Sequence, residues 1–113
     1  MTQPLLAGDH ATDDATGLDL GRIRVNPRAN GRMSWKAQEI YNDITRRLGA
    51  REGVLVIDLA RELPKSSRYF YDFIHFSNEG AEAVADIASR ELCPVLATRF
   101  PAFVSGGCPG VAK

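Results

Sequence analysis

The chain has 113 residues, of which 44% are hydrophobic, and its 14 basic and 14 acidic side chains give a formal net charge of +0. This size and composition are typical of one small globular domain rather than of a disordered or membrane protein. The balanced charge favours neither nucleic acid nor an anionic membrane surface as a partner, so no nucleic acid is expected to bind.

Residues 1–32 are polar and rich in turn formers, which predicts a long segment with little regular structure. Asn26 and Pro27 form one turn signal, and Asn30 and Gly31 form another. A loop of about 30 residues is unusual inside a compact domain, where such loops are functional or disordered. We therefore expect that part of the surface against which this segment packs is missing from the chain.

Residues 34–48 have the spacing of an amphipathic helix. Ser34 is a suitable N-cap, and Gly49 follows a basic pair at the predicted end. The apolar residues recur at helical spacing, namely Ala37, Ile40, Tyr41, Ile44 and Leu48.

Residues 54–57 form a short, continuous apolar run that ends at Asp58, which predicts a strand buried on both faces in a parallel sheet. A second strand is expected, at most, in residues 1–6. One or two strands are too few for a doubly wound sheet, which typically has about five or six. The chain is therefore expected to be the back part of a larger α/β domain.

A second helix is predicted to begin at Ser77 or Asn78 and to stop at Pro94. Its apolar positions are Ala81, Val84, Ala85, Ala88 and Leu92. The order helix, strand, loop, helix is that of an α/β protein. Residues 1–96 are assigned to this domain, and residues 97–113, which are rich in glycine and proline, are expected to be a flexible tail.

The loop before this helix holds Asp72 three residues ahead of His75. Loops that leave the carboxyl ends of strands are where α/β domains bind ligands. At this separation the carboxylate can fold back and accept the imidazole Nδ1 proton, which leaves Nε2 free to take a proton from a hydroxyl nucleophile. A purely structural pair, in which the histidine caps the helix or donates to the carboxylate, fits the same spacing.

Residues 72–80, with residues 53–59 before them, resemble the C-terminal motif of the SGNH (GDSL) hydrolase family, in which a D-x-x-H loop precedes the final helix. The similarity covers residues 1–96. It implies a flavodoxin-like three-layer α/β/α fold, of which this chain would hold the C-terminal part and lack the N-terminal strands. It also implies hydrolysis of esters, with His75 as general base and Asp72 orienting it, and with no cofactor and no metal.

The serine nucleophile of this family lies in a Gly-Asp-Ser motif near the start of the domain, and a glycine and an asparagine from later blocks form the oxyanion hole. The resemblance implies that all three lie ahead of Met1, so none of them can be placed on the present sequence. Gly8-Asp9-His10 has a histidine where the motif needs a serine and is interpreted as a turn. Ser34 and Ser77 are interpreted as helix caps. Ser66 and Ser67 are interpreted as loop residues.

The expected substrate is an acyl ester of a small molecule, a carbohydrate or a lipid, with Tyr71 and Phe73 as weaker candidates for contacting it. Two alternatives stay open. In the first, the chain is a non-catalytic remnant that acts as an interaction module or needs a partner chain, with oligomerisation through an exposed sheet edge. In the second, it is an unrelated enzyme that pairs His75 with a local serine such as Ser67 or Ser77.

Cys93 and Cys108 lie outside any metal-binding spacing. A buried Cys93 thiol is favoured, and a disulfide between the two is the alternative for an exported protein. His10 and the nearby Asp9, Asp13 and Asp14 are expected to be solvated rather than to bind metal. The sequence shows neither a membrane-spanning run nor an export signal, so the cytoplasm is the default localisation, while that of the parent protein is unknown.

Overall fold

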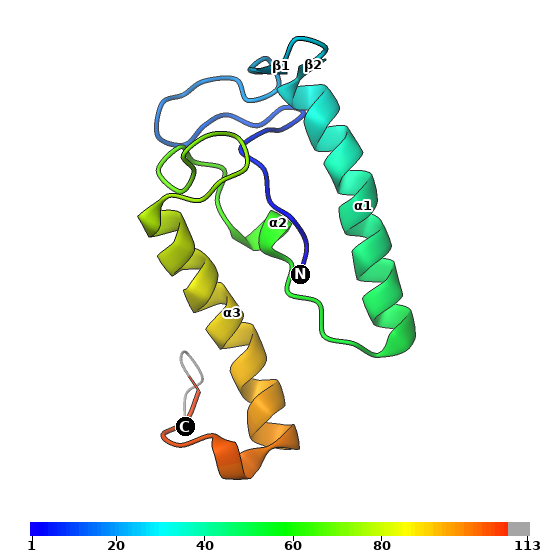
Figure 1. Ribbon diagram of the computed structural model, residues 1–113, viewed down its shortest axis with the longest axis vertical. Helices are drawn as coiled ribbons and strands as arrows, with labels where there is room; N and C mark the ends of the chain where they lie inside the picture. Colours follow the sequence, from blue (N-terminus) through cyan, green and yellow to red (C-terminus); the bar gives the residue numbers. More distant parts are fainter. Residues whose placement is uncertain (109–113) are drawn as a thin grey trace.

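The computed structural model describes residues 1–108, which form a mixed α/β structure with three α-helices and a two-stranded sheet. The elements are β1 (Arg24–Asn26), β2 (Ala29–Asn30), α1 (Gly31–Glu52), α2 (Leu59–Glu62), α3 (Asn78–Arg99) and the 3-10 helix η1 (Pro101–Phe103). In Figure 1 the long helices α1 and α3 lie apart, with the N-terminal segment and α2 between them. These residues do not form a three-layer sandwich, and none of their helices is long and apolar enough to cross a membrane.

Helix α1 begins earlier and ends later than the sequence predicted. Asn30, and not Ser34, is the N-cap, because its side chain accepts a hydrogen bond from the Met33 N–H at 3.0 Å. Gly49 lies inside the helix rather than at its end. A Cβ atom there would come within 2.2 Å of the Val56 side chain, so this glycine permits close packing and does not terminate the helix.

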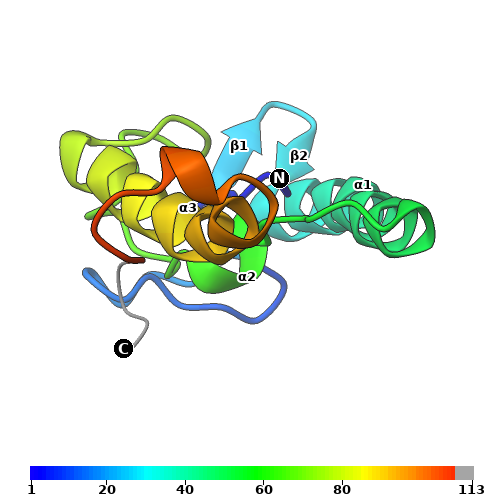
Figure 2. The same ribbon diagram turned by 90° about the horizontal axis from the view of Figure 1, so that it is seen from below.

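The predicted apolar face of α1 is exposed. Ile40 is 62%, Ile44 49% and Leu48 47% exposed, whereas the polar Asn42 on the covered side is only 2% exposed. An amphipathic helix normally turns its apolar face to the core. Here no element among residues 1–108 covers that face, since α3 lies on the other side of the molecule (Figure 2).

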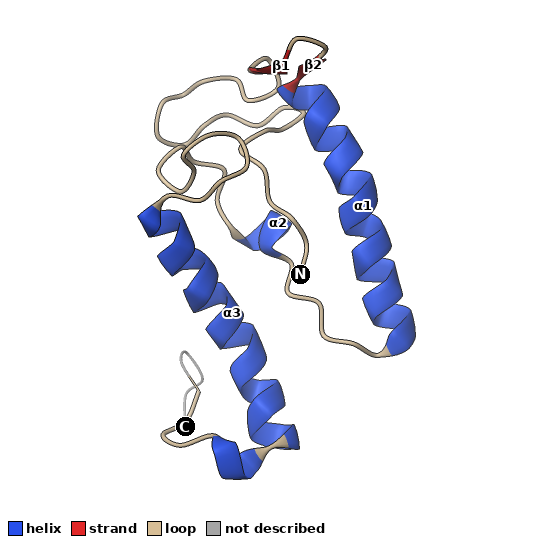
Figure 3. Ribbon diagram, viewed as in Figure 1, coloured by secondary structure: helices blue, strands red, loops and turns tan. Residues whose placement is uncertain are grey.

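The predicted strand at residues 54–57 is extended but belongs to no sheet (Figure 3). It runs beside the N-terminal segment, and one backbone hydrogen bond joins the two, from the Thr2 N–H to the Ile57 carbonyl at 3.0 Å. Ile57 is buried, but Val54 is 62% and Leu55 41% exposed, so the prediction of burial on both faces was wrong. A parallel sheet needs further strands on either side, and the described residues do not supply them.

Polar side chains of α1 take the place of a sheet in holding these extended segments. Asn42 accepts from the Gln3 N–H at 2.9 Å and donates to the Gln3 carbonyl at 3.0 Å, as a neighbouring strand would. Arg46 binds both carboxylate oxygens of Asp58, at 2.6 and 2.9 Å, and Asp58 also accepts from the Thr2 hydroxyl at 2.8 Å. The N-terminal segment, residues 54–58 and α1 are therefore joined mainly through side chains.

Helix α3 begins as predicted, because the Ser77 side chain accepts from the Gly80 N–H at 3.1 Å and caps it. Its predicted end was wrong, since Pro94 lies inside the helix, which runs to Arg99. A proline removes one backbone hydrogen bond. The turns after it close normally, with the Phe100 N–H donating to the Leu96 carbonyl at 2.7 Å.

The segment that follows η1 is joined to α3 at Cys108. Cys93 and Cys108 form a disulfide across 15 residues, so the favoured free Cys93 thiol was wrong and the alternative holds. Within the predicted tail, residues 97–99 belong to α3 and residues 101–103 to η1, and its flexibility stays a prediction. The rest of that expectation, for residues 109–113, lies outside the described residues.

The N-terminal third is irregular, as predicted, but it contributes to the folded structure. Leu5, Ala7 and Leu20 are buried, and β1 and β2 form a short antiparallel hairpin. Asp13 is only 3% exposed, so the expectation that it is solvated was wrong. The segment packs because buried hydrogen bonds, described below, replace regular secondary structure.

Candidate functional site

The Asp72 and His75 side chains lie at the tip of a small hairpin loop. An antiparallel bridge between Phe70 and Phe76 closes its base, and their ring centroids lie 5.5 Å apart. Phe70 is 4% exposed and belongs to the main hydrophobic core. The Tyr71 N–H donates to the His75 carbonyl at 2.8 Å. The loop thus presents an exposed tip on an anchored base, at the end of the molecule where α1 and α3 begin (Figure 1).

The two side chains are in direct contact. Asp72 Oδ2 lies 2.8 Å from His75 Nδ1, and Asp72 Oδ1 accepts from the Ile74 and His75 N–H groups, each at 2.8 Å. The imidazole side chain is 75% exposed, and no hydrogen bond reaches its Nε2 from any part of the chain that the structure describes. The arrangement holds the ring by Nδ1 and leaves Nε2 facing solvent.

These contacts keep Asp72 ionised. The His75 backbone N–H, the His75 ring and the Ile74 N–H together lower the pKa of the Asp72 carboxyl to about 2. A carboxylate on Nδ1 favours the tautomer with the proton on Nδ1 and the lone pair on Nε2. That tautomer can accept a proton from a hydroxyl. The purely structural role considered in the sequence analysis requires the same contact between Asp72 and His75, so this geometry is common to both roles.

We expect Asp72 to titrate near pH 2 in carboxyl-detected NMR. The folded-state pKa of Asp72 is below the ordinary aspartate value of about 3.9. The contribution of its contacts to stability is therefore fully present above about pH 3.9 and is lost as the pH falls through about 2. His75→Ala removes the ring but keeps both backbone donors, so the midpoint should rise only part of the way. A wild-type midpoint near 4 would contradict the observed geometry.

The structure shows different contacts for each of the three local serines. Ser77 Oγ donates to the Arg68 carbonyl at 2.7 Å while it accepts from the Gly80 N–H, which fits its predicted role as a cap. Ser66 is 2% exposed, and the Ser67 N–H binds a carboxylate. Across residues 1–108 no serine hydroxyl forms a hydrogen bond to His75, so the absence of a nucleophile stays a prediction.

The two residues predicted to contact substrate differ in exposure. Tyr71 is 81% exposed and lines a shallow pocket of about 300 Å³, together with Ser77 and the ion pair of Arg68 and Glu79. Phe73 is half-buried, and its carbonyl accepts from the Leu6 N–H at 2.9 Å. Tyr71 is therefore the more accessible of the two, and both substrate contacts stay predictions.

Asp13 binds the backbone at Ser67, five residues before Asp72, a contact that the sequence analysis missed. Its carboxylate accepts from the Ser67 N–H at 2.8 Å, the Ala15 N–H at 3.2 Å and the Thr16 hydroxyl. Burial would raise the pKa of Asp13, but the bonds from Thr16, Ser67 and Ala15 outweigh it and lower the pKa to about 2. The order Asp13, Thr16, Gly17 is a turn signal that could have indicated such a carboxylate.

The described part of the chain brings no three histidine, cysteine, aspartate or glutamate side chains together in a way that could hold a metal ion. His10 lies 3.7 Å from Asp9, whose carboxylate is already paired with Arg32 at 2.7 Å and Lys36 at 3.4 Å. No ligand set for a metal or cofactor can be named here.

The chain was compared with family models, with curated proteins and with solved structures. None of the three comparisons gives a match. The interpretation of this site therefore depends on its own geometry and on the motif around Asp72 and His75.

Proposed function

We propose that this chain carries the acid–base part of a serine ester hydrolase of SGNH type, whose nucleophile and oxyanion hole come from polypeptide outside it. The observation that supports this most is the 2.8 Å contact between Asp72 Oδ2 and His75 Nδ1, with Nε2 exposed. A partner on Nδ1 that is ionised near neutral pH and a free Nε2 are what a general base for a hydroxyl nucleophile requires.

In the proposed reaction, His75 Nε2 removes the proton from the serine hydroxyl while the serine oxygen attacks the acyl carbon. The oxyanion hole stabilises the tetrahedral intermediate, which collapses to an acyl-enzyme as the imidazolium protonates the leaving alcohol. Water, deprotonated by His75, then releases the acid and regenerates the serine. Asp72 remains ionised throughout and stabilises the imidazolium.

The exposed apolar surfaces support an incomplete domain. The α1 face at Ile40, Ile44 and Leu48 and the extended residues Val54 and Leu55 are all more than two-fifths exposed. The radius of gyration is 16.2 Å, whereas a compact domain of this length has about 13 Å. The remaining strands and helices of a three-layer sandwich would cover these surfaces, and they would carry the serine.

A non-catalytic interaction module is the second candidate, and the same exposed faces favour it. In that case the apolar faces bind a partner chain without completing an active site. Catalysis distinguishes the two, because only the hydrolase needs His75 once the faces are covered.

The test compares this chain with a longer product that includes the in-frame coding sequence directly upstream of Met1. Alone, the chain should not react with a fluorophosphonate probe and should hydrolyse p-nitrophenyl acetate no faster than free imidazole. The longer product should react with the probe, and His75→Ala should abolish the labelling while the matched His10→Ala variant retains it. Labelling of the isolated chain would indicate a local serine, and an unlabelled longer product would favour the interaction module.

A further inference from the structure

The hairpin β1–β2 and the first turns of α1 contain a local excess of positive charge within a neutral chain. Between Asp19 and Glu39 every charged residue is basic, and these are Arg22, Arg24, Arg28, Arg32 and Lys36. Carboxylates neutralise part of this set: Asp19 lies 3.4 Å from Arg22, and Asp9 binds Arg32 and Lys36. Within residues 1–108, Arg24 and Arg28 have no carboxylate oxygen within 4 Å.

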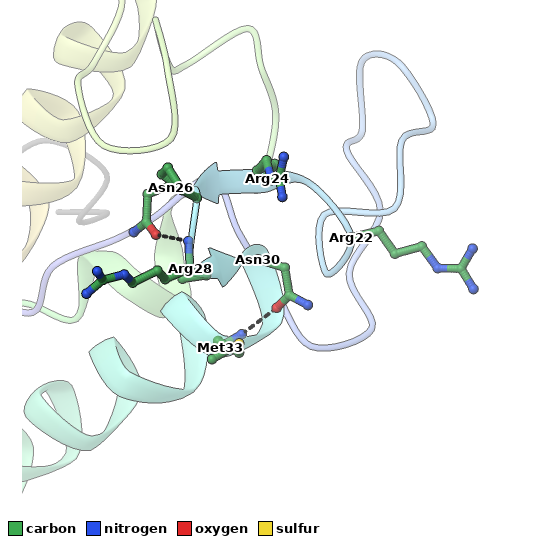
Figure 4. A pocket seen from close by; sticks show the side chains of 8 residues that line it. Arg22, Arg24, Asn26, Arg28, Asn30 and Met33 are labelled. Atoms are coloured by element: carbon green, nitrogen blue, oxygen red, sulfur yellow. Dashed lines mark hydrogen bonds between the residues drawn. The ribbon is translucent and has the colours of Figure 1, made fainter.

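A pocket of about 230 Å³ lies among these residues (Figure 4). Its polar side chains are Arg22, Arg24, Arg28, Asn26 and Asn30. Asn26 Oδ1 accepts from the Arg28 N–H at 2.8 Å, and Asn30 Oδ1 accepts from the Met33 N–H at 3.0 Å. Because each amide oxygen is already used, the side chains around the pocket offer N–H donors and no carboxylate.

The backbone holds this pocket against the start of α1. The Gly31 N–H donates to the Ile23 carbonyl at 2.8 Å, and the Arg32 N–H donates to the Gly21 carbonyl at 3.0 Å. A Cβ atom at Gly31 would come within 1.8 Å of the Leu20 carbonyl oxygen, so only glycine permits this approach. The first turn of α1 has no acidic residue, and the positive end of the helix dipole therefore adds to the field of the arginines.

We propose that this pocket binds a tetrahedral phosphate group, held by the guanidinium groups of Arg24 and Arg28 and by the Nδ2 donors of Asn26 and Asn30. In Figure 4 the Arg28 side chain extends away from Arg24, so Arg28 must turn toward Arg24 for both guanidinium groups to hold one anion. A phosphate monoester has two charges and several acceptor oxygens, which match two forked guanidinium groups better than a planar carboxylate does. This site is independent of the proposed hydrolase chemistry.

The test is a titration of the ¹⁵N-labelled full chain with glycerol 3-phosphate, followed by backbone and side-chain amide signals at constant ionic strength. Saturable shifts are expected at Asn26, Asn30 and the two arginines. Arg24→Gln/Arg28→Gln should weaken binding by at least about tenfold. Arg47→Gln/Arg51→Gln removes the same charge from the other end of α1 and should leave binding unchanged.

Arg24→Lys/Arg28→Lys keeps the charge and removes the forked donors, so it should bind with intermediate affinity even where the glutamine variant fails to fold. Phosphatidylcholine vesicles with and without phosphatidic acid distinguish a lipid headgroup from a free phosphate ester as the source of the phosphate. The proposal would be overturned by signal shifts that grow linearly with glycerol 3-phosphate concentration and do not saturate, or by the same shifts on addition of sodium chloride. Equal loss of binding in the control pair would also overturn it, since the anion would then respond to overall charge.

Discussion

The Arg46→Ala variant is expected to lose about 3 kcal/mol of unfolding free energy, a large share of the stability of a domain this small. Arg46 is only 15% exposed, and its guanidinium binds both oxygens of Asp58 as well as Glu39 at 2.6 Å. Removing it leaves a largely covered Asp58 carboxylate with the Thr2 hydroxyl as its remaining close donor. It also removes the side-chain link between α1 and Asp58, and leaves the Asn42 contacts with Gln3 in place.

Urea denaturation followed by circular dichroism measures this loss. Arg61→Ala is the matched control, because Arg61 lies 3.7 Å from the same carboxylate but is 64% exposed, and exposed pairs contribute at most about 1 kcal/mol. Arg46→Lys should recover only part of the loss, since an ammonium lacks the planar fork that donates two parallel hydrogen bonds to the carboxylate oxygens. Equal effects of Arg46→Ala and Arg61→Ala would show that the bidentate pair does not hold α1 in place.

The pKa of Asp58 gives a second readout of the same interaction. The hydrogen bond from Arg46 lowers this pKa, against the effect of burial, and the Thr2 hydroxyl lowers it further. Its contribution to stability is therefore present above the ordinary aspartate pKa and is lost as the pH falls below it. In Arg46→Ala the Asp58 pKa should rise. The unfolding free energy of the variant should therefore fall less than that of the wild type as the pH is lowered.

Local features of the structure could be predicted from the sequence. Ser77 caps α3, and Asp72 meets His75, because each contact spans only three residues and follows from backbone geometry. Contacts between distant positions could not be predicted. Asn42 pairs with Gln3 across 39 residues, and no periodicity in the sequence marks a buried asparagine as the partner of an extended segment.

The predictions that failed share one physical cause. Apolar periodicity reports which face of an element is suited to burial, and it does not report whether a partner is present. Ile44 of α1 and Val54 of the extended segment fit the patterns of a buried helix face and a buried strand, yet both are about half exposed or more. These patterns match the incomplete domain that the proposed function requires.

In the longer, probe-reactive product, Asp72→Asn is expected to lower kcat by about 10⁴-fold, as the loss of the orienting carboxylate does in serine hydrolases. The asparagine Oδ1 can still accept from the Ile74 and His75 N–H groups, so the loop keeps its shape. Its Nδ2 would donate to His75 Nδ1, which moves the ring proton to Nε2. A protonated Nε2 cannot accept the proton of the serine hydroxyl.

The tautomer can be measured in the 113-residue chain itself, by long-range ¹H–¹⁵N correlation of the neutral His75 ring. We expect the proton on Nδ1 in the wild type and on Nε2 in Asp72→Asn, while His10 serves as the internal reference. A purely structural pair would show the same change of tautomer, but the longer product would then keep its activity. A change of tautomer together with the loss of kcat would assign the pair to catalysis, and unchanged activity would refute the general-base role of His75.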